Sequence, residues 1–154
     1  MARDPGSPAS PLLVIPLVLI ALFVLAAALA PQEVTGGAPG DFLLVSLVMG
    51  GSAAWHTGKA VARAWRSPAS LALYCVPLAA AVRFCHFALF GDDLFSPAAS
   101  LAEFVFLFAV AALGFRAVRR RQMSVQYGWM FAPAGPLCWR RLDGTEAGEG
   151  ANAP

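Results

Sequence analysis

Four long apolar stretches, almost free of charged side chains, constrain this chain more than any other feature of its sequence. About 20 apolar residues are enough for a helix to cross the hydrocarbon core of a bilayer. Only 13% of the residues are charged, whereas about a quarter are charged in a typical soluble domain. The sequence therefore predicts an all-α integral membrane protein with four transmembrane helices, in one membrane domain over residues 12–121. The helices are expected at about residues 12–30, 42–66, 68–90 and 98–121.

The first stretch carries no charge and is interrupted only by Pro16. Its end, Ala28-Leu29-Ala30, resembles a signal-peptidase site. The apolar run is longer than the roughly 7–15 residues of a signal peptide, however, so we expect the helix to be retained.

The second stretch is long enough only if its helix continues past the apolar part into a basic region. Long basic side chains allow this, because their stems can lie along apolar surface while their charges reach the headgroups. The three basic residues of the second helix are Lys59, Arg63 and Arg66.

The third stretch follows Ser67-Pro68, a capping residue and a proline at the first helical position.

Basic and acidic residues lie at opposite ends of the predicted helices. The connections at residues 31–41 and 91–99 contain acidic residues and no basic ones. By the positive-inside rule, the basic side faces the cytoplasm, and both chain termini lie there. Arg83 is the one basic residue that departs from this pattern. The basic residues on the cytoplasmic side are Arg3, Lys59, Arg63, Arg66, Arg116, Arg119, Arg120, Arg121, Arg140 and Arg141.

The parts of the chain outside the helices are of two kinds. Residues 1–11 and 144–154 are rich in small residues and have no apolar anchor, so we expect them to be disordered. Residues 122–143 form an aromatic and basic juxtamembrane segment, suited to anionic lipid headgroups or to docking on a partner protein. Nucleic acid is disfavoured as a partner, because this segment is apolar-rich and tethered to the membrane. Its proposed contact residues are Tyr127, Trp129, Phe131, Trp139 and Arg140.

Arg83 and His86 lie on one helical face inside the third apolar stretch. A charge inside a membrane is costly unless it is paired, so a partner is expected. Glu103 is the candidate, held between the guanidinium and the imidazole across a helical hairpin. The alternative is that Glu103 forms a capping box with Ser100. For the cluster, we favour an ion pair that fixes helix packing over a catalytic or transport role.

A small residue stands at every fourth position of the second helix. Such a stripe lets two helix backbones approach closely. We favour packing inside the bundle, and contact with another membrane protein is the alternative. The stripe consists of Ser46, Gly50, Ala54 and Gly58.

The sequence contains no constellation that is typical of an enzyme or a cofactor site. No Ser/His/Asp set, glycine-rich phosphate loop or metal-ligand cluster is found. His56 and His86 fall at opposite ends of the predicted bundle, too far apart to hold a haem. Three cysteines without a CxxC pair favour packing as free thiols over a disulfide or a zinc site. We therefore predict a non-enzyme without metal or cofactor.

Four segments, "GGSAAWHTGKAVARAWR", "AVRFCHFALF", "RRRQMSVQYGWMF" and "AGPLCWR", together resemble a known family. They are similar to a domain-of-unknown-function family of small bacterial inner-membrane proteins, often encoded beside branched-chain amino-acid ABC transporter genes. The resemblance covers about Gly40 to Arg141. Similar proteins look three-helical and begin near Asp41, so the first helix of this chain is a departure. The matching positions are Arg83, Phe84, His86, Phe87, Glu103, Gly135, Pro136, Leu137, Trp139 and Arg140.

These features lead us to expect a multi-pass protein of the bacterial inner (plasma) membrane. We expect it to act as a non-enzymatic accessory or assembly subunit of a membrane transporter. The resemblance implies that its partner is a permease of the branched-chain amino-acid ABC class. The alternative is a small transporter or membrane enzyme that uses Arg83, His86 and Glu103 as an anion or proton site.

Overall fold

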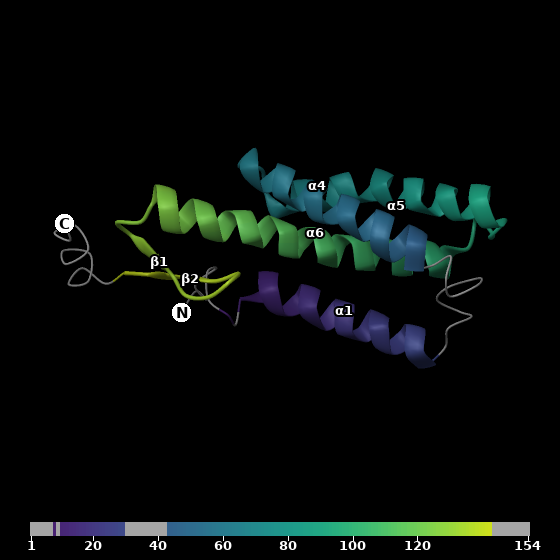
Figure 1. Cartoon of the computed structure of the whole chain (residues 1–154), viewed down its shortest axis with the longest axis horizontal. Coiled ribbons are helices and arrows are strands. Elements are labelled where there is room, and N and C mark those ends of the chain that lie inside the picture. Colours follow the sequence, from purple (N-terminus) through teal and green to yellow (C-terminus); the bar gives the residue numbers. More distant parts are fainter. Residues whose placement is uncertain (1–7, 9, 30–42, 143–154) are drawn as a thin grey trace.

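The computed structural model describes residues 8, 10–29 and 43–142, which form a bundle of helices followed by a short hairpin (Figure 1). The expected helical class is confirmed for this part of the chain. The disorder expected at both chain ends, and the acidic connection at 31–41, fall almost entirely outside the described residues. The elements are α1 (Pro11–Leu29), η1 (Leu43–Gly50), α4 (Gly51–Arg63), α5 (Pro68–Phe90), α6 (Pro97–Gln126), β1 (Phe131–Pro133) and β2 (Trp139–Arg141).

Helix α5 begins and ends where its sequence signals place the boundaries. The Ser67 hydroxyl accepts a hydrogen bond from the Ser70 backbone N–H at 3.3 Å, and Pro68 is the first helical residue. At the other end, Gly91 has a left-handed backbone with φ of 74°. A residue with a side chain adopts this conformation less readily, which suits glycine to the position. The predicted start at Ser67-Pro68 is therefore confirmed.

The second predicted helix, residues 42–66, consists of two kinds of helix. Its first part, η1, is a π-helix, a form with wider turns than the α-helix. Its second part, α4, ends in a Schellman motif, in which the residue after the cap is left-handed. That residue is Trp65, with φ of 56°. The Arg66 N–H binds the Val61 carbonyl at 3.2 Å, and the Trp65 N–H binds the Ala62 carbonyl at 3.0 Å.

The juxtamembrane segment expected at 122–143 has regular structure. Helix α6 continues to Gln126, beyond the expected end at 121. The chain then forms the antiparallel pair β1 and β2, in which Phe131 lies opposite Arg141. This hairpin is an addition to the predicted all-α architecture. It packs against α6, which gives so short a pair of strands a surface to bury.

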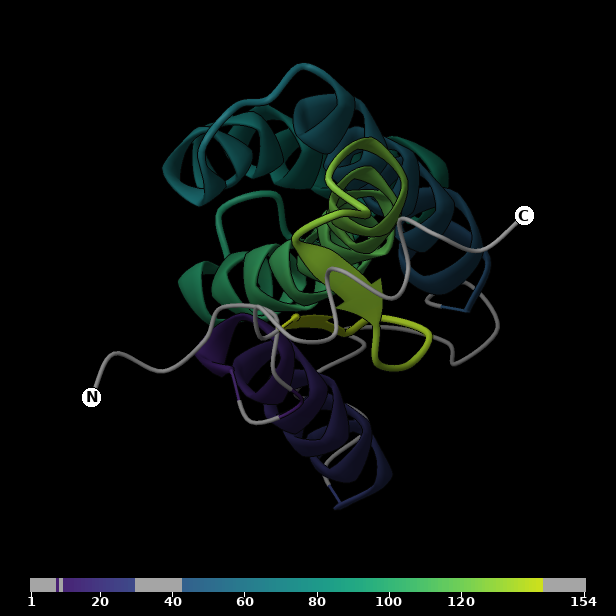
Figure 2. The same cartoon turned by 90° about the vertical axis from the view of Figure 1, so that its left-hand side faces the viewer.

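Helix α6 is the central element of the bundle. Figures 1 and 2 show α1 on one side of α6, with α4 and α5 on the other. Helices α4 and α6 approach so closely that a Cβ added at Gly58 would lie 1.9 Å from the Ala111 carbonyl oxygen. A Cβ at Gly114 would lie 2.4 Å from the Trp55 carbonyl oxygen. Glycine is required at both positions because backbone occupies the space.

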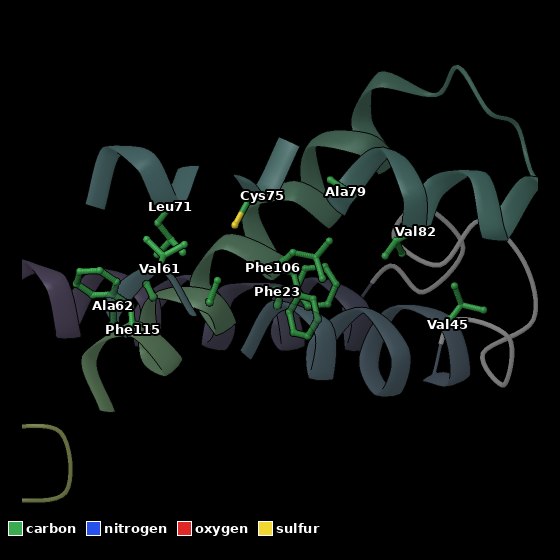
Figure 3. Close-up of a cluster of buried hydrophobic side chains, with 14 residues drawn as sticks. Phe23, Val45, Val61, Ala62, Leu71, Cys75, Ala79, Val82, Phe106 and Phe115 are labelled. Atoms are coloured by element: carbon green, nitrogen blue, oxygen red, sulfur yellow. The ribbon is translucent and has the colours of Figure 1, made fainter. Parts of the chain in front are cut away.

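The hydrophobic core lies along α6 and draws side chains from every helix. Phe23 of α1 stacks on Phe106 of α6, with ring centroids 4.7 Å apart. Cys75 belongs to this core as a free thiol, and the other two cysteines are also free. Figure 3 labels the core residues Phe23, Val45, Val61, Ala62, Leu71, Cys75, Ala79, Val82, Phe106 and Phe115.

Within the described residues, two helices, α5 and α6, are long and apolar enough to cross a membrane. The apolar stretch described within α1 is shorter, at Leu13–Leu25. Large apolar side chains point outward from α1, η1 and α5, as expected of a surface that meets lipid or another protein. Together these features indicate association with a membrane. The outward-facing residues include Val14, Ile15, Leu17, Val18, Leu22, Val24, Leu25, Leu44, Leu47, Val48, Leu73, Val76, Phe84, Phe87 and Leu89.

Candidate functional site

Three buried polar side chains connect η1, α5 and α6 inside the bundle. The Ser46 Oγ lies 2.8 Å from Nε2 of His86 and donates a hydrogen bond to Oε1 of Glu103 at 2.9 Å. Nε2 of His86 is also 3.2 Å from Oε1 of Glu103. None of the three residues is more than 4% exposed. Their contacts with one another therefore replace the hydrogen bonds that water would otherwise make.

The directions of these hydrogen bonds follow from the number of protons available. A serine hydroxyl has one proton, and Ser46 donates it to Glu103. Nε2 of His86 must then carry a proton in order to bind the Ser46 oxygen. That leaves Nδ1 on the other side of the ring, 3.5 Å from Oδ2 of Asp92. The imidazole thus stands between a deeply buried carboxyl group and a second one in the turn after α5.

Arg83 does not pair with Glu103 in the way that the sequence suggested. Its Nη2 donates a hydrogen bond to the backbone carbonyl of Asp93, in the turn after α5. Among the described residues, no ion pair joins Arg83 to Glu103. The physical reason is that Ser46 and His86 already hold Glu103, while the long Arg83 side chain extends toward the turn. The expected His86–Glu103 contact is present, and the expected guanidinium contact is not.

The capping-box alternative for Glu103 is wrong. Helix α6 begins at Pro97, with Ser96 as its N-cap residue, so Ser100 already lies inside the helix. The Ser100 hydroxyl donates to the Ser96 carbonyl at 2.8 Å instead of capping the helix. Glu103 faces the bundle interior, where Ser46 binds it.

The structure places the small-residue stripe inside the bundle. Ser46 and Ala54 are fully buried, and Gly50 and Gly58 are buried as well. Gly58 lies against the backbone of α6, and a Cβ at Gly50 would meet Leu107 of α6 at 3.1 Å and Val82 of α5 at 3.2 Å. This face is occupied within the chain, as the packing interpretation expects. A contact with another membrane protein would have to use a different surface.

A second polar arrangement holds the hairpin to α6. Arg116 is 1% exposed, and its Nε donates to the Leu137 carbonyl at 3.0 Å. Its guanidinium lies over the Trp139 ring, 5.1 Å from the centroid. Trp139 is itself buried, at 6% exposure. Its expected role as a contact for lipid or a partner is therefore wrong, because the ring packs against a buried cation.

The other four residues proposed to contact lipid or a partner lie at different positions around the hairpin and the C-terminal end of α6. Trp129 is 66% exposed. Tyr127 meets the ring of Trp65 edge-on, with centroids 6.2 Å apart. Phe131 is half-buried in β1, and Arg140 is exposed in β2. Of the five, Tyr127, Trp129 and Arg140 are exposed.

Side chains of α6 also complete the C-terminal end of α4. Arg119 donates to the Arg66 carbonyl at 2.9 Å, and Gln122 donates to the Ala62 carbonyl at 3.1 Å. The Arg119 guanidinium lies 4.6 Å from the centroid of the Trp65 ring. The Ala62 carbonyl, which also accepts from the Trp65 N–H, thereby gains a second donor, and the Arg66 carbonyl just beyond the helix end is bound as well. The contact between the Arg119 guanidinium and the Trp65 ring also gives a reason why the left-handed position 65 holds a tryptophan and not a glycine.

Sequence reasoning missed one member of the buried cluster, Ser46, and the carboxylate beside it, Asp92. Ser46 was predicted as a packing residue, and its place in a small-residue stripe was the available signal that its hydroxyl faces other helices. Asp92 was read only as a marker of topology. In the part of the chain that the structure describes, no group of three His, Cys, Asp or Glu side chains is placed to hold a metal ion. The cluster can lock three helical elements together, or it can pass a proton along the line Glu103, His86, Asp92.

Comparison with known proteins places this arrangement in a family. A search of curated proteins and a search of solved structures each found no match. The profile of a domain of unknown function, DUF6867, matches residues 38–142. The matched region contains η1, α4, α5, α6 and the hairpin, and with them the whole buried cluster, while α1 lies outside it. The chain therefore belongs to the DUF6867 family.

Proposed function

We propose that this protein is a multi-pass protein of the bacterial inner (plasma) membrane, with four transmembrane helices and both termini in the cytoplasm. It serves there as a non-enzymatic accessory or assembly subunit of a membrane transporter. The transporter is a permease of the branched-chain amino-acid ABC class, which the resemblance noted above implies. Nine of the eleven basic residues lie together at the end of the bundle formed by the C-terminal parts of α4 and α6 and by the hairpin, which supports this orientation.

The close contact between α4 and α6 is the observation that most supports an accessory role. A solute passage between these helices would need space, but the Gly58 position meets the backbone of α6 directly. Backbone atoms cannot rotate aside as a side chain can, so this contact fixes α4 and α6 against each other and makes the bundle a rigid scaffold. A scaffold of this kind is suited to holding surfaces for other proteins.

Two surfaces are available for a transporter. The outward face of α5 presents two exposed aromatic side chains, Phe84 and Phe87. At the basic end, Trp129 stands beside the hairpin, whose Arg140 and Arg141 are exposed. An exposed tryptophan with neighbouring arginines has the composition of a protein-binding anchor. We assign the first surface to the permease and the second to its cytoplasmic parts.

Purification of the full-length protein in mild detergent tests this assignment. The permease and its nucleotide-binding subunits should co-elute in fixed proportion. Trp129→Ser should reduce their recovery, whereas Phe95→Ser should not, although Phe95 is also an exposed aromatic residue, at 87% exposure, at the opposite end. A homo-oligomer that elutes without any permease would refute the accessory role.

A second candidate function is proton transfer, and the buried cluster favours it. Glu103, Ser46 and His86 lie within hydrogen-bonding distance of one another, and Asp92 lies 3.5 Å beyond the imidazole. A proton could pass along this line as in the relays of membrane pumps. Under this function, His86→Gln in reconstituted vesicles should abolish a proton flux that the unmodified protein supports. Equal flux for both proteins would exclude it.

A further inference from the structure

A cleft lies between α4 and α6 at the basic end of the bundle. It has a volume of about 550 Å³. It forms where α4 stops at Arg63 while α6 continues to Gln126, so the longer helix extends past the end of the shorter one. Trp55 and Trp65 are among the residues that line it. The buried cluster of Ser46, His86 and Glu103 does not contribute to this cleft.

Three cations from two different helices line the cleft. Lys59 and Arg63 come from α4, and Arg121 comes from α6. None of the described residues lining it is acidic. The three carboxylates of the described chain belong to the opposite end, at the turn after α5 and the first part of α6. The cleft therefore carries a concentrated positive charge that no described residue compensates.

These three cations differ from other basic residues nearby because their side chains form no hydrogen bond with any described residue. Arg116 and Arg119 both donate hydrogen bonds to backbone carbonyls and hold the fold together. Among the described residues, neither a hydrogen bond nor an ion pair engages the three cleft cations. Lys59 makes a cation–π contact, with its Nζ 5.9 Å from the centroid of the Trp55 ring. Charges left uncommitted around a concave site are what an anionic ligand requires.

The surroundings of the cleft identify the kind of anion. Tryptophan side chains with basic neighbours are typical of the headgroup layer of a membrane. Ala117 and Val118 also line the cleft and precede Arg121 by about one turn of α6, on the bilayer side in the proposed orientation, so an apolar surface borders the charged one. A lipid offers a phosphate to the cations and acyl chains to the apolar border. A free phosphate ion would leave that border in water.

We infer that the cleft between α4 and α6 is a binding site for the headgroup of an anionic phospholipid. Lys59, Arg63 and Arg121 bind the phosphate, and Trp55 and Trp65 form the walls of the site. The site shares no residue with the surfaces assigned to a transporter, so it does not depend on the identity of that partner. Because basic pockets at the cytoplasmic face are known to hold anionic headgroups, the proposed chemistry matches the proposed orientation.

Titration of the full-length protein in a neutral detergent tests the site. The ligands are phosphatidylglycerol, phosphatidylcholine and inorganic phosphate, and tryptophan fluorescence reports occupancy, since Trp55 and Trp65 line the cleft. Phosphatidylglycerol should bind saturably and raise the thermal midpoint. Phosphatidylcholine, which has no net charge, should produce neither effect. If inorganic phosphate at the same concentration binds as well as phosphatidylglycerol does, the lipid assignment is overturned.

Two double variants with the same change in charge separate a defined site from general attraction. Arg63→Gln with Arg121→Gln removes two cleft cations and should weaken phosphatidylglycerol binding about tenfold or more. Arg66→Gln with Arg141→Gln removes two exposed cations from the same end that do not line the cleft. This control should weaken binding by less than about twofold. Circular dichroism establishes that both variants fold, and equal losses of affinity would overturn the inference.

Discussion

Replacing Gly58 with alanine tests whether backbone contact between α4 and α6 sets the spacing of the bundle. The new Cβ would lie 1.9 Å from the Ala111 carbonyl oxygen, 2.8 Å from the Ala111 carbonyl carbon and 2.9 Å from the Phe115 nitrogen. All three are backbone atoms, so no side-chain rotation can relieve the overlap. The two helices would have to separate by more than about 1 Å to restore an ordinary contact.

The cost of that separation follows from two opposing effects. Alanine favours a helix over glycine by about 1 kcal/mol, which stabilises the variant. Overpacking a well-filled interior costs about 1–3 kcal/mol, and more where the backbone itself must move. Separation would also weaken the contacts that neighbouring side chains make along the same interface. We therefore expect Gly58→Ala to lower the free energy of unfolding by about 2 kcal/mol or more.

Gly51 of the same helix provides the matched control. A Cβ there would find its nearest atoms at 3.8–3.9 Å, which is ordinary contact. Gly51→Ala should therefore leave stability unchanged or raise it slightly. Thermal unfolding of both variants in one detergent, followed by circular dichroism, makes the comparison. If Gly58→Ala is as stable as Gly51→Ala, α4 and α6 are not in backbone contact in the folded protein.

Three further outcomes are expected. Ser46→Ala leaves the buried His86 and Glu103 side chains without their shared hydroxyl and should lower the free energy of unfolding by about 1–3 kcal/mol. Ser52→Ala removes an exposed hydroxyl and should lower it by less than about 0.5 kcal/mol. Equal unfolding midpoints for the two variants would contradict the hydrogen bonds of the buried cluster. At the left-handed position, Trp65→Gly should be more stable than Trp65→Ala by about 1 kcal/mol, since glycine adopts that backbone freely; denaturant titration of the two variants measures the difference. A topology reporter inserted within residues 31–41 should show that this segment is periplasmic, and a reporter fused after Arg121 should show that this position is cytoplasmic. The reverse pattern would invert the proposed topology.

The sequence predicted what depends on neighbouring residues in the chain. The start of α5 at Ser67-Pro68 could be read directly, because a cap and a proline act on the turn that contains them. The small-residue stripe was likewise visible from its spacing alone. The meeting of His86 with Glu103 required only a helical hairpin of the expected length.

What the sequence did not predict depends on contacts between distant residues. Ser46 contacts His86 across 40 positions and Glu103 across 57. Its place in a stripe of small residues indicates that it faces other helices, but not which residues it meets there. The burial of Trp139 depends on Arg116, a residue read from the sequence as one of many cytoplasmic charges. Charge patterns predict which side of a membrane a residue faces. They do not distinguish an arginine in solvent from one that binds a hairpin.

The central position of α6 has a consequence for how the protein is made. This helix is the last of the bundle to leave the ribosome, yet α1, the first, packs on it. In the proposed topology, α1 therefore stays in the bilayer without its partner during synthesis while two further hydrophobic segments insert. Ser46 and His86 are likewise synthesised before Glu103, whose carboxyl group later binds them. In that topology the nascent protein carries polar groups into lipid before they can be satisfied, which makes this stage the one at which a membrane insertase or chaperone would be needed most.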